Sequence, residues 1–354
     1  MSVPNVSVVM SVYNGERYLR SAIDSILGQT FRDFEFLIVN DGSADGSREI
    51  IRSYSDPRIR LIDNDRNLGL TRSLNVGLRR ARAPLVARQD ADDVSHPTRL
   101  ERQLQFLNGN AEVALLGAQA EMIGDRGAHL SYPELCKATE EESIRWQMTV
   151  DSAFVHTSVM FRRADILEQF GGYDETFTNG QDADLWSRVA GKYSVRNLAE
   201  ILVDNRVHAE SISSRKRFIT AEAIRRGESI YLRNLRRVLS PEIVPDEWVS
   251  HYVGLYVGRT LSAAEAECLL RGLRSIARQF FSIPHEPLVA TEFRRVLAAK
   301  FMLLAASFRS THRLLAARAA SSSFRYSRRV ASAPMHRRIL RLRSEALGRL
   351  GLVF

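Results

Sequence analysis

The sequence predicts an α/β fold in which a mostly parallel, Rossmann-like sheet is covered by helices and followed by a mainly α-helical C-terminal region. Short apolar runs alternate with segments of helical apolar spacing through the first 120 residues, a pattern typical of a wound parallel sheet. The chain has 354 residues, which corresponds to about two domains. Hydrophobic residues make up 45% and charged residues 26%, and these ordinary globular values exclude wholesale disorder.

The strands are predicted from β-branched and aromatic runs, and the helices from apolar residues spaced three or four apart. Val6–Val12 (VSVVMSV) is the first strand and Gly15–Leu27 the first helix. Further strands are predicted at Phe34–Val39, Ile59–Ile62, Leu85–Ala87 and Val113–Gly117. Further helices are predicted at Ser47–Tyr54, at Leu70–Ala81 and after Pro97.

Polar side chains follow three of these strands at the point where each strand ends. Tyr13-Asn14 follows the first strand, Asn40-Asp41 the second, and Asp90–Asp93 the fourth. Ligands of open parallel sheets bind beyond the carboxyl ends of the strands. We therefore expect a binding site where these three clusters meet.

Beyond about residue 153 the pattern becomes mixed and then helical. Strands are predicted at Phe154–Phe161 and Ile201–Val207, and helices at Arg163–Phe170 and from Asp182. After Ser211 the chain is rich in Ala, Leu and Arg at helical spacing. We expect a first domain of residues 1–212 and a basic helical region of residues 213–354.

The two predicted domains differ in charge. Residues 1–210 carry 24 Lys and Arg against 31 Asp and Glu, a net charge of −7, whereas the remainder carries +16. Such asymmetry indicates that the second part meets something anionic. The stretches Arg294–Phe308 and Arg325–Leu350 are basic and amphipathic, which favours an anionic membrane surface or a partner protein; a helical bundle with solvated arginine faces is the alternative.

Other features narrow the class of protein. No zinc finger or RNP-like motif is present, so we expect no nucleic-acid partner. The apolar stretch Phe301–Phe308 is too short to span a bilayer. Cys136 and Cys268 lie far apart, which fits a reducing compartment, and the N-terminus lacks the basic region of a signal peptide. We expect a cytoplasmic protein, peripheral on the inner face of the membrane if the basic region binds lipid.

The segment Asp90-Ala91-Asp92-Asp93 places three carboxylates within four residues. Like charges this close are costly unless a cation lies among them or they extend into water. Oxygen ligands suit a hard divalent ion, Mg²⁺ or Mn²⁺, which also binds substrate phosphates. The alternative is a solvated acidic loop that caps the helix after Pro97.

The order of motifs resembles the family 2 glycosyltransferases, inverting enzymes with the GT-A fold. The resemblance covers about residues 3–214 and leaves the C-terminal 140 residues outside it. It rests on Ser7–Asn14, Ser25–Thr30, Asn40–Ser47, Asn67–Leu70, Asp90–Asp93 with Pro97 and Arg99-Leu100, Gly171–Glu175, Gln181–Trp186 and Arg206–His208.

The resemblance implies a nucleotide-diphosphate sugar as donor, with a preference for UDP. Asp41 would accept a hydrogen bond from the base, and Tyr13 would stack on it. Asp41 also suits a turn by itself, and Tyr13 could instead pack on the first helix. The donor-binding residues implied are Ser11, Tyr13, Asn14, Asp41, Asn67, Asp90, Ala91 and Asp92.

The resemblance also implies a divalent ion and a general base. Asp92 would be the main metal ligand, helped by Asp90 and Asp93, and His208 would complete the site or contact the diphosphate. A structural role for His208 after a strand is equally open. Asp182 would take a proton from the acceptor hydroxyl, although it could instead be the N-cap of the following helix. Asp184 is the second choice.

The acceptor is expected to be a glycan or a lipid-linked sugar of polysaccharide biosynthesis in the cell envelope. The residues expected on its side of the site are His156, Gly172, Tyr173, Gln181 and Trp186. His156 could instead be a satisfied residue at a strand, and Trp186 is better read as core than as a sugar platform. Gln181 stands where the family usually has Glu.

The sequence leaves one main alternative function open and gives little support to others. A non-catalytic module that binds sugar nucleotides or glycans, with a basic tail for a membrane or partner, is the main alternative, and Gln181 favours it slightly. A nucleotidyltransferase would need a Gly-rich basic loop after the first strand, and Val12–Glu16 is not of that kind. No GxxxxGK[ST] loop is present to support a kinase or ATPase.

Overall fold

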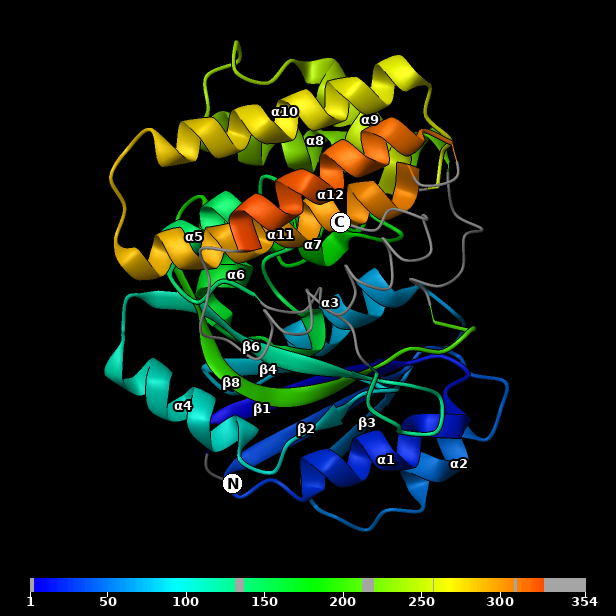
Figure 1. Cartoon of the computed structure of the whole chain (residues 1–354). Helices are drawn as coiled ribbons and strands as arrows, with labels where there is room; N and C mark the ends of the chain where they lie inside the picture. Colours follow the sequence, from blue (N-terminus) through cyan, green and yellow to red (C-terminus); the bar gives the residue numbers. More distant parts are fainter. Residues whose placement is uncertain (1–2, 131–136, 212–219, 257, 309–310, 328–354) are drawn as a thin grey trace. The chain divides into compact units, whose positions relative to one another are not determined.

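The structure is a computed structural model that describes residues 3–130, 137–211, 220–256, 258–308 and 311–327. It separates into two compact units. The first, here called the sheet unit, comprises residues 1–131 and 154–215, and the second, the helical unit, comprises residues 132–153 and 216–354. The α/β fold followed by helices that the sequence predicts is confirmed (Figure 1).

The sheet unit is built on eight strands in the order β3-β2-β1-β4-β7-β6-β8-β5. The first four strands are parallel, as predicted, while β7 is antiparallel to both of its neighbours. The strands are β1 Val6–Val12, β2 Phe34–Asn40, β3 Ile59–Asp63, β4 Leu85–Asp90, β5 Val94–Ser95, β6 Val113–Ile123, β7 Met160–Arg162 and β8 Ser194–Arg206.

Helices cover both faces of the parallel strands because alternate residues of β1 point to opposite sides. Val8 and Met10 pack into one apolar cluster with Leu19 and Ile23 of α1. Val9 faces the other way, where a Cβ at Gly77 of α3 would lie 2.5 Å from its Cγ1, so only glycine allows this approach. The helices of this unit are α1 Glu16–Leu27, α2 Ser47–Arg52, α3 Leu70–Arg80, α4 Arg99–Gly109, α6 Arg163–Phe170 and α7 Gln181–Ala190.

The strand predicted at Phe154–Phe161 is wrong over most of its length. His156–Ser158 forms a 3₁₀ turn, and β7 begins only at Met160. The Ser158 hydroxyl donates to the carbonyl oxygens of Val155 and Ala118, so a local side-chain bond competes with the strand ladder.

The helical unit joins the segment before residue 153 to the C-terminal helices. The Glu292 carboxylate of α11 accepts hydrogen bonds from the Thr139 N–H and hydroxyl at 2.9 and 2.5 Å. The buried Asp151 carboxylate lies 3.2 Å from the Lys300 Nζ. The helices are α5 Glu141–Gln147, α8 Ala221–Val238, α9 Asp246–Tyr256, α10 Ala263–Phe281, α11 Pro287–Phe308 and α12 Arg313–Ser327. Among the residues described, none of the helices is both long and apolar enough to cross a membrane.

Glu35 should be the strongest single polar anchor between β1, β2 and the end of α3. Its buried carboxylate accepts from the Ser7 hydroxyl at 2.6 Å, from the Arg82 N–H at 2.7 Å and from the guanidinium groups of Arg60 and Arg82. Burial alone would raise the pKa of Glu35, but these donors lower it overall. We expect Glu35→Gln to lower the free energy of unfolding by about 2–3 kcal/mol at pH 7.

Urea denaturation measures this change, with the exposed Glu49→Gln as control, for which we expect less than about 0.5 kcal/mol. Because the pKa is lowered in the folded state, the contribution of Glu35 is present above the pKa of the unfolded chain. It should be lost as the pH falls through the folded-state pKa. Equal effects of the two substitutions at pH 7 would contradict the anchoring role.

Candidate active site

The three predicted polar clusters meet at one edge of the sheet. Val12 of β1 pairs with Asn40 of β2, and Ser11 of β1 pairs with Asp90 of β4. The Asp41 N–H also donates to the Val12 carbonyl oxygen at 2.8 Å. Because these strands are parallel, the residues that follow them emerge side by side.

The loops after β1 and β2 are tied together through Asn14. Among the described non-glycine residues, only Asn14 has a positive φ, of 50°. Its side-chain oxygen accepts from the Ala44 N–H at 2.8 Å, and its own N–H donates to the Ser43 hydroxyl at 3.1 Å. Tyr13 is 52% exposed, so part of its ring surface is accessible to a ligand, and its stacking on a base stays a prediction.

Asp41 is buried and holds the loop before α3. Its carboxylate accepts from the N–H groups of Leu68 and Gly69 at 2.8 and 2.9 Å and from the Asn64 amide at 2.9 Å. The Gly69 N–H also donates to the Asn67 side-chain oxygen. Asp41 therefore fixes the conformation of the loop that leads into α3. Its contact with a nucleotide base stays a prediction.

The acidic cluster is held by β8. Asp93 is buried, and its two oxygens accept from the Arg206 N–H at 2.7 Å and the Asn205 amide at 2.9 Å. The His208 Nε2 lies 2.9 Å from an Asp92 oxygen, and the Arg88 guanidinium lies 2.5 Å from an Asp90 oxygen. The structure thus brings together the predicted Asp90, Asp92, Asp93 and His208.

Crowded carboxylates shape the electrostatics of this cluster. Burial raises the pKa of Asp92, as does the Asp90 carboxylate, although the hydrogen bond from His208 opposes the shift. Burial raises the pKa of Asp93 well above its ordinary value, and the other two carboxylates add to the effect. A cation among these groups would relieve the repulsion.

The donor set of the cluster fits a divalent ion. The side chains of Asp90 and Asp92 are 28% and 31% exposed, so their oxygens can reach a ligand outside the sheet. His208 offers an imidazole beside them, and its buried Nδ1 has no hydrogen-bond partner among the described residues. Both oxygens of Asp93 already accept protein donors, so direct ligation by Asp93 stays a prediction.

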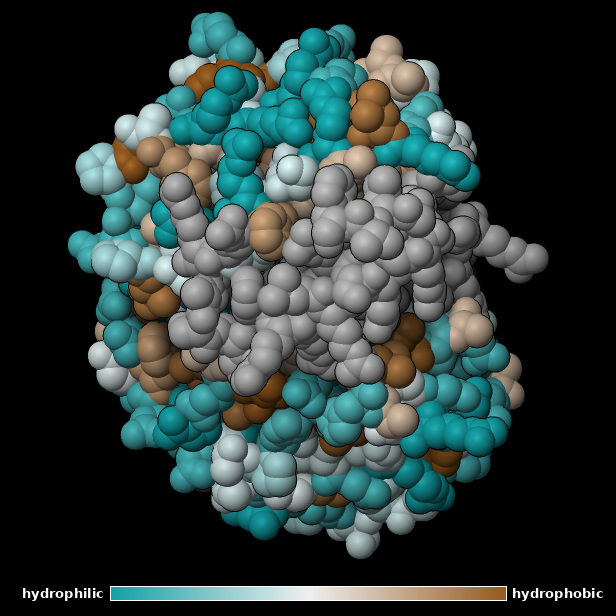
Figure 2. Space-filling view, viewed as in Figure 1, coloured by the Kyte–Doolittle hydropathy of each residue, from teal (hydrophilic) through white to brown (hydrophobic). Residues whose placement is uncertain are grey.

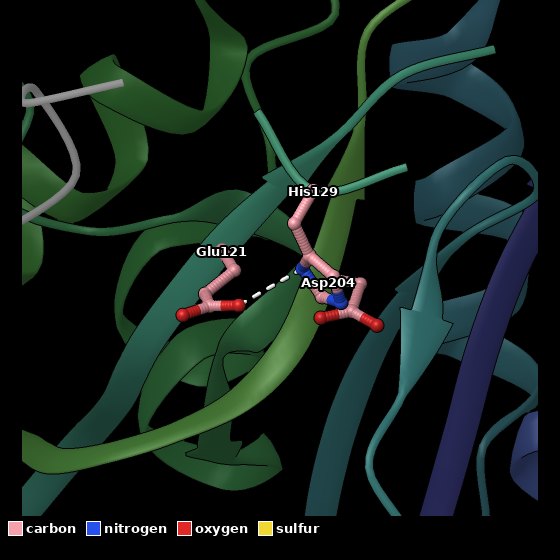
Figure 3. Close-up of side chains that lie close together, drawn as sticks. All are labelled: Glu121, His129 and Asp204. Carbon is pink, nitrogen blue, oxygen red and sulfur yellow. Dashed lines mark ion pairs between the residues drawn. The ribbon is translucent and has the colours of Figure 1, made fainter. Parts of the chain in front are cut away.

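A second group of possible metal ligands lies on neighbouring strands and was missed by sequence reasoning. Figure 3 shows Glu121 of β6, His129 and Asp204 of β8, whose ligand atoms lie within 4.8 Å of one another. His129 Nδ1 is 2.9 Å from the Glu121 carboxylate. The three residues come from separate segments, so no local motif marks them, and Glu121 and His129 are exposed.

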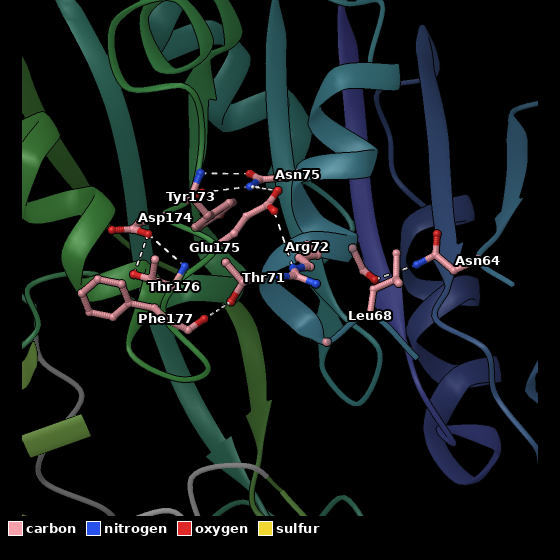
Figure 4. Close-up of polar contacts among 12 residues, drawn as sticks. Asn64, Leu68, Thr71, Arg72, Asn75, Tyr173, Asp174, Glu175, Thr176 and Phe177 are labelled. Atoms are coloured by element: carbon pink, nitrogen blue, oxygen red, sulfur yellow. Dashed lines mark hydrogen bonds and ion pairs between the residues drawn. The ribbon is translucent and has the colours of Figure 1, made fainter. Parts of the chain in front are cut away.

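A loop from 172 to 177 is anchored on α3 and frames the other side of the site (Figure 4). The Asn75 side chain accepts from the Tyr173 N–H at 2.9 Å and donates to the Tyr173 carbonyl oxygen at 2.8 Å. The Thr71 hydroxyl donates to the Phe177 carbonyl oxygen at 2.6 Å. These contacts hold Tyr173 so that its hydroxyl lies 3.0 Å from the Nε2 of His156.

The side chains of Trp186, Tyr173 and His156 pack together next to this loop. The Trp186 ring lies 6.1 Å from the His156 ring and 5.9 Å from the Tyr173 ring, measured between centroids. Trp186 is 1% exposed, as expected of a core residue. Burial and the cationic Arg88 lower the pKa of His156, so the ring is neutral at pH 7.

Asp182 occupies the second position of α7 and is not its N-cap. The N-cap is Gly180, and no side chain bonds the first turn of the helix. Among the residues described, none donates a hydrogen bond to the Asp182 carboxylate, whereas Asp184 pairs with Arg188 at 2.8 Å. Asp182 and Asp90 both act electrostatically on His156 and Tyr173, so the four groups share one neighbourhood.

Some of the buried polar atoms without hydrogen-bond partners belong to residues predicted for the site or to their neighbours. In the part of the chain that the structure describes, they include Gln181 Oε1, Trp186 Nε1, His208 Nδ1 and two nitrogens of Arg88. Buried polar groups are almost always paired in the absence of a ligand site. Sequence reasoning missed Arg88; its signal is a charged residue inside the apolar run of β4.

Comparison with solved structures defines the class of this fold. S. aureus TarS in complex with UDP-GlcNAc has a TM-score of 0.55 at 16% identity and covers 99% of this chain and 93% of its own. The mannosyltransferase PcManGT from Pyrobaculum calidifontis, in complex with GDP-Man and Mn²⁺, has a TM-score of 0.52 at 18% identity, with coverage of 92% and 88%. The fold is that of the GT-A glycosyltransferases.

Comparison of sequences defines the family. The model for glycosyl transferase family 2 matches residues 7–170. An uncharacterised glycosyltransferase of Methanocaldococcus jannaschii is 37% identical over 214 residues, which are 58% of this chain and 72% of that protein. The O-antigen biosynthesis glycosyltransferase WbnJ of Escherichia coli is 32% identical over 214 residues, covering 58% and 81%. The chain belongs to glycosyl transferase family 2.

Gly172 should be required both for backbone conformation and for space. Its φ is +92°, and a Cβ there would lie 2.6 Å from the Asn75 Oδ1 that holds Tyr173. We expect Gly172→Ala to lower the free energy of unfolding by about 3 kcal/mol or more, since strain and overpacking add.

The neighbouring Gly171 is a matched control, because its φ is +68° but a Cβ would meet nothing within 4 Å. Gly171→Ala should therefore cost only the backbone strain, about 1–2 kcal/mol. Thermal and urea denaturation of the two variants test the difference. Equal costs would show that the contact with Asn75 imposes no constraint.

Proposed function

We propose that this protein is an inverting glycosyltransferase that moves a sugar from a nucleoside-diphosphate donor to a hydroxyl of a glycan or lipid-linked acceptor. The observation that carries the proposal is the position of Asp182. Its carboxylate accepts no hydrogen bond from the described residues, stands in the first turn of α7, and acts electrostatically on His156 and Tyr173, as Asp90 does. A general base needs an accepting oxygen that the protein itself does not occupy.

In the proposed reaction, Asp182 accepts the proton of the acceptor hydroxyl. The acceptor oxygen attacks the anomeric carbon while the bond to the nucleoside diphosphate breaks on the opposite side, so a single displacement inverts the anomeric centre. The buried side-chain oxygen of Gln181 has no partner among the described residues, and we assign it to the acceptor, while Trp186 belongs to the core on that side of the site. His156, Tyr173 and Gly172 complete that side of the site.

We propose that the donor lies along the edge formed by β1, β2 and β4. The exposed ring of Tyr13 stacks on the base, and Ser11, Asn14, Asp41 and Asn67 shape its pocket. A UDP-sugar remains our first choice of donor. TarS was solved with UDP-GlcNAc and PcManGT with GDP-Man, so both nucleotides belong in any screen.

We also propose that Asp92, Asp90 and His208 would hold Mn²⁺ or Mg²⁺, and that Ala91 of the same turn belongs to the donor site. When bound, such an ion neutralises charge on the leaving diphosphate. Asp93 positions this turn by accepting from Arg206 and Asn205. The Mn²⁺ in the PcManGT structure supports this choice of ion.

The acceptor and the site of action are proposals as well. WbnJ is named as an O-antigen biosynthesis glycosyltransferase, which supports a proposed role of this protein in polysaccharide biosynthesis. We propose a cytoplasmic location from the sequence. Most of the basic stretch Arg325–Leu350, which we expect to meet an anionic membrane, lies outside the described residues. A non-catalytic binding module is less favoured, because such a module has no need of an unengaged carboxylate at Asp182.

Replacing Asp182 should separate donor binding from transfer. We expect Asp182→Asn to lower the rate of transfer by about 10²–10⁴-fold, since general-base help is lost, while the donor Kd stays unchanged. Release of UDP or GDP from a panel of nucleotide sugars, with membrane extract as acceptor source, measures turnover, and calorimetry measures donor binding.

Asp184→Asn is the matched control on the same helix. It removes the ion pair with Arg188 and should lower Tm while transfer by the folded enzyme stays within about tenfold. Full turnover in Asp182→Asn, or a larger loss of turnover in Asp184→Asn, would mean that Asp182 is not the base.

A further inference from the structure

The helical unit contains a cavity that the transfer reaction does not use. The cavity has a volume of about 450 Å³ and lies between α10 and α12. Its lining carries four arginines, two serines and a tyrosine, and no carboxylate: Arg271, Arg274, Arg278, Ser321, Ser322, Arg325 and Tyr326. Figure 2 shows mainly hydrophilic side chains on the visible face over α10.

The arginines converge because of helix geometry. Arg271, Arg274 and Arg278 are spaced by three and four residues, which places them on one face of α10. Ser321 and Arg325 are spaced by four residues on α12. The Arg274 guanidinium joins the two helices by donating to the Ser322 hydroxyl at 3.0 Å and to the Arg318 carbonyl oxygen at 3.3 Å.

The described carboxylates do not neutralise the positive charge of the arginines in this cavity. Arg271, Arg278 and Arg325 form no ion pair with any described carboxylate, and the nearby Glu267 is already paired with Arg318 at 2.5 Å. Burial and the neighbouring cations Arg318 and Arg325 lower the pKa of Arg274. An anion in the cavity would remove this repulsion.

The cavity also offers hydroxyl donors held in place. Tyr326 lies nearly parallel to Phe301, with the ring centroids 5.6 Å apart, and its ring is likewise stacked on Phe281. Burial raises the pKa of Tyr326, so its hydroxyl is protonated and can donate. Together with the serines, it lies among guanidinium groups, each of which has five N–H donors.

We infer that this cavity is a binding site for a phosphate or diphosphate group. Such a group carries several acceptor oxygens and more than one negative charge, which match several guanidinium forks and hydroxyls better than a carboxylate with two oxygens. The group can belong to a free phosphorylated molecule or to a phospholipid headgroup, since both present the same oxygens. The site is separate from the donor site of the sheet unit, and the inference does not depend on the proposed function.

Two pairs of substitutions in the full chain test the inference. Arg278→Gln with Arg325→Gln removes two exposed cavity arginines, and Arg225→Gln with Arg313→Gln removes two exposed arginines of the same unit that do not line the cavity. The change in net charge is the same in both pairs. Circular dichroism and Tm check that each variant is folded.

The probes are pyrophosphate, measured by calorimetry in EDTA, and phosphatidylcholine vesicles containing phosphatidic acid, measured by flotation. EDTA removes divalent ions that would bring pyrophosphate to the acidic cluster. We expect the variant with both cavity substitutions, the cavity pair, to bind at least one probe about tenfold more weakly than the unchanged protein. The variant with both control substitutions, the control pair, should bind each probe within about twofold of the unchanged protein.

Loss of pyrophosphate binding in the cavity pair alone supports a free phosphorylated ligand. If the cavity pair alone loses vesicle binding, and the unchanged protein shows no measurable binding of pyrophosphate, the ligand is a phospholipid headgroup. Equal behaviour of the cavity pair and the control pair with both probes would overturn the inference.

Discussion

The crowding of three carboxylates at the turn after β4 is the constraint on which the site depends. The turn persists because Asp93 is buried against the backbone of β8 and Asp92 lies against His208. These contacts link β4 to β8, strands that are not neighbours in the sheet. Because like charges repel at this distance, a cation among the three carboxylates would stabilise the turn, and the proposed donor diphosphate would lie at the same end of the sheet.

Other elements of the sheet unit position further predicted site residues at the same end of the strands. Parallel pairing places Asp41 and the acidic turn at the same end of the sheet, on opposite sides of β1, and the loop at residues 172–177 is held on α3 by Asn75 and Thr71. Among the described residues, Arg88, Gln181 and Trp186 each keep a buried polar atom without a hydrogen-bond partner, and so do residues elsewhere in the protein, such as Ser143 and Arg295.

Sequence reasoning recovered the parts of the fold that follow from local pattern. The strands at Val6–Val12 and Phe34–Asn40, and with them the shared edge, are visible as apolar runs ended by polar residues. The 3₁₀ turn at His156–Ser158 was missed, because the Ser158 hydroxyl contacts the carbonyl oxygens of Val155 in the turn and of Ala118 in β6, and the apolar pattern of the segment reveals neither contact. The cavity between α10 and α12 and the group at Glu121, His129 and Asp204 were also beyond reach, since each joins segments with no shared motif.

The most direct measurement is the position of a bound metal. Crystals grown with Mn²⁺ and UDP or GDP, with data collected at the manganese absorption edge, locate the ion by its anomalous signal. The account predicts one strong peak within bonding distance of an Asp92 oxygen and of the nucleotide diphosphate. A peak confined to Glu121, His129 and Asp204, with none beside Asp92, would contradict it.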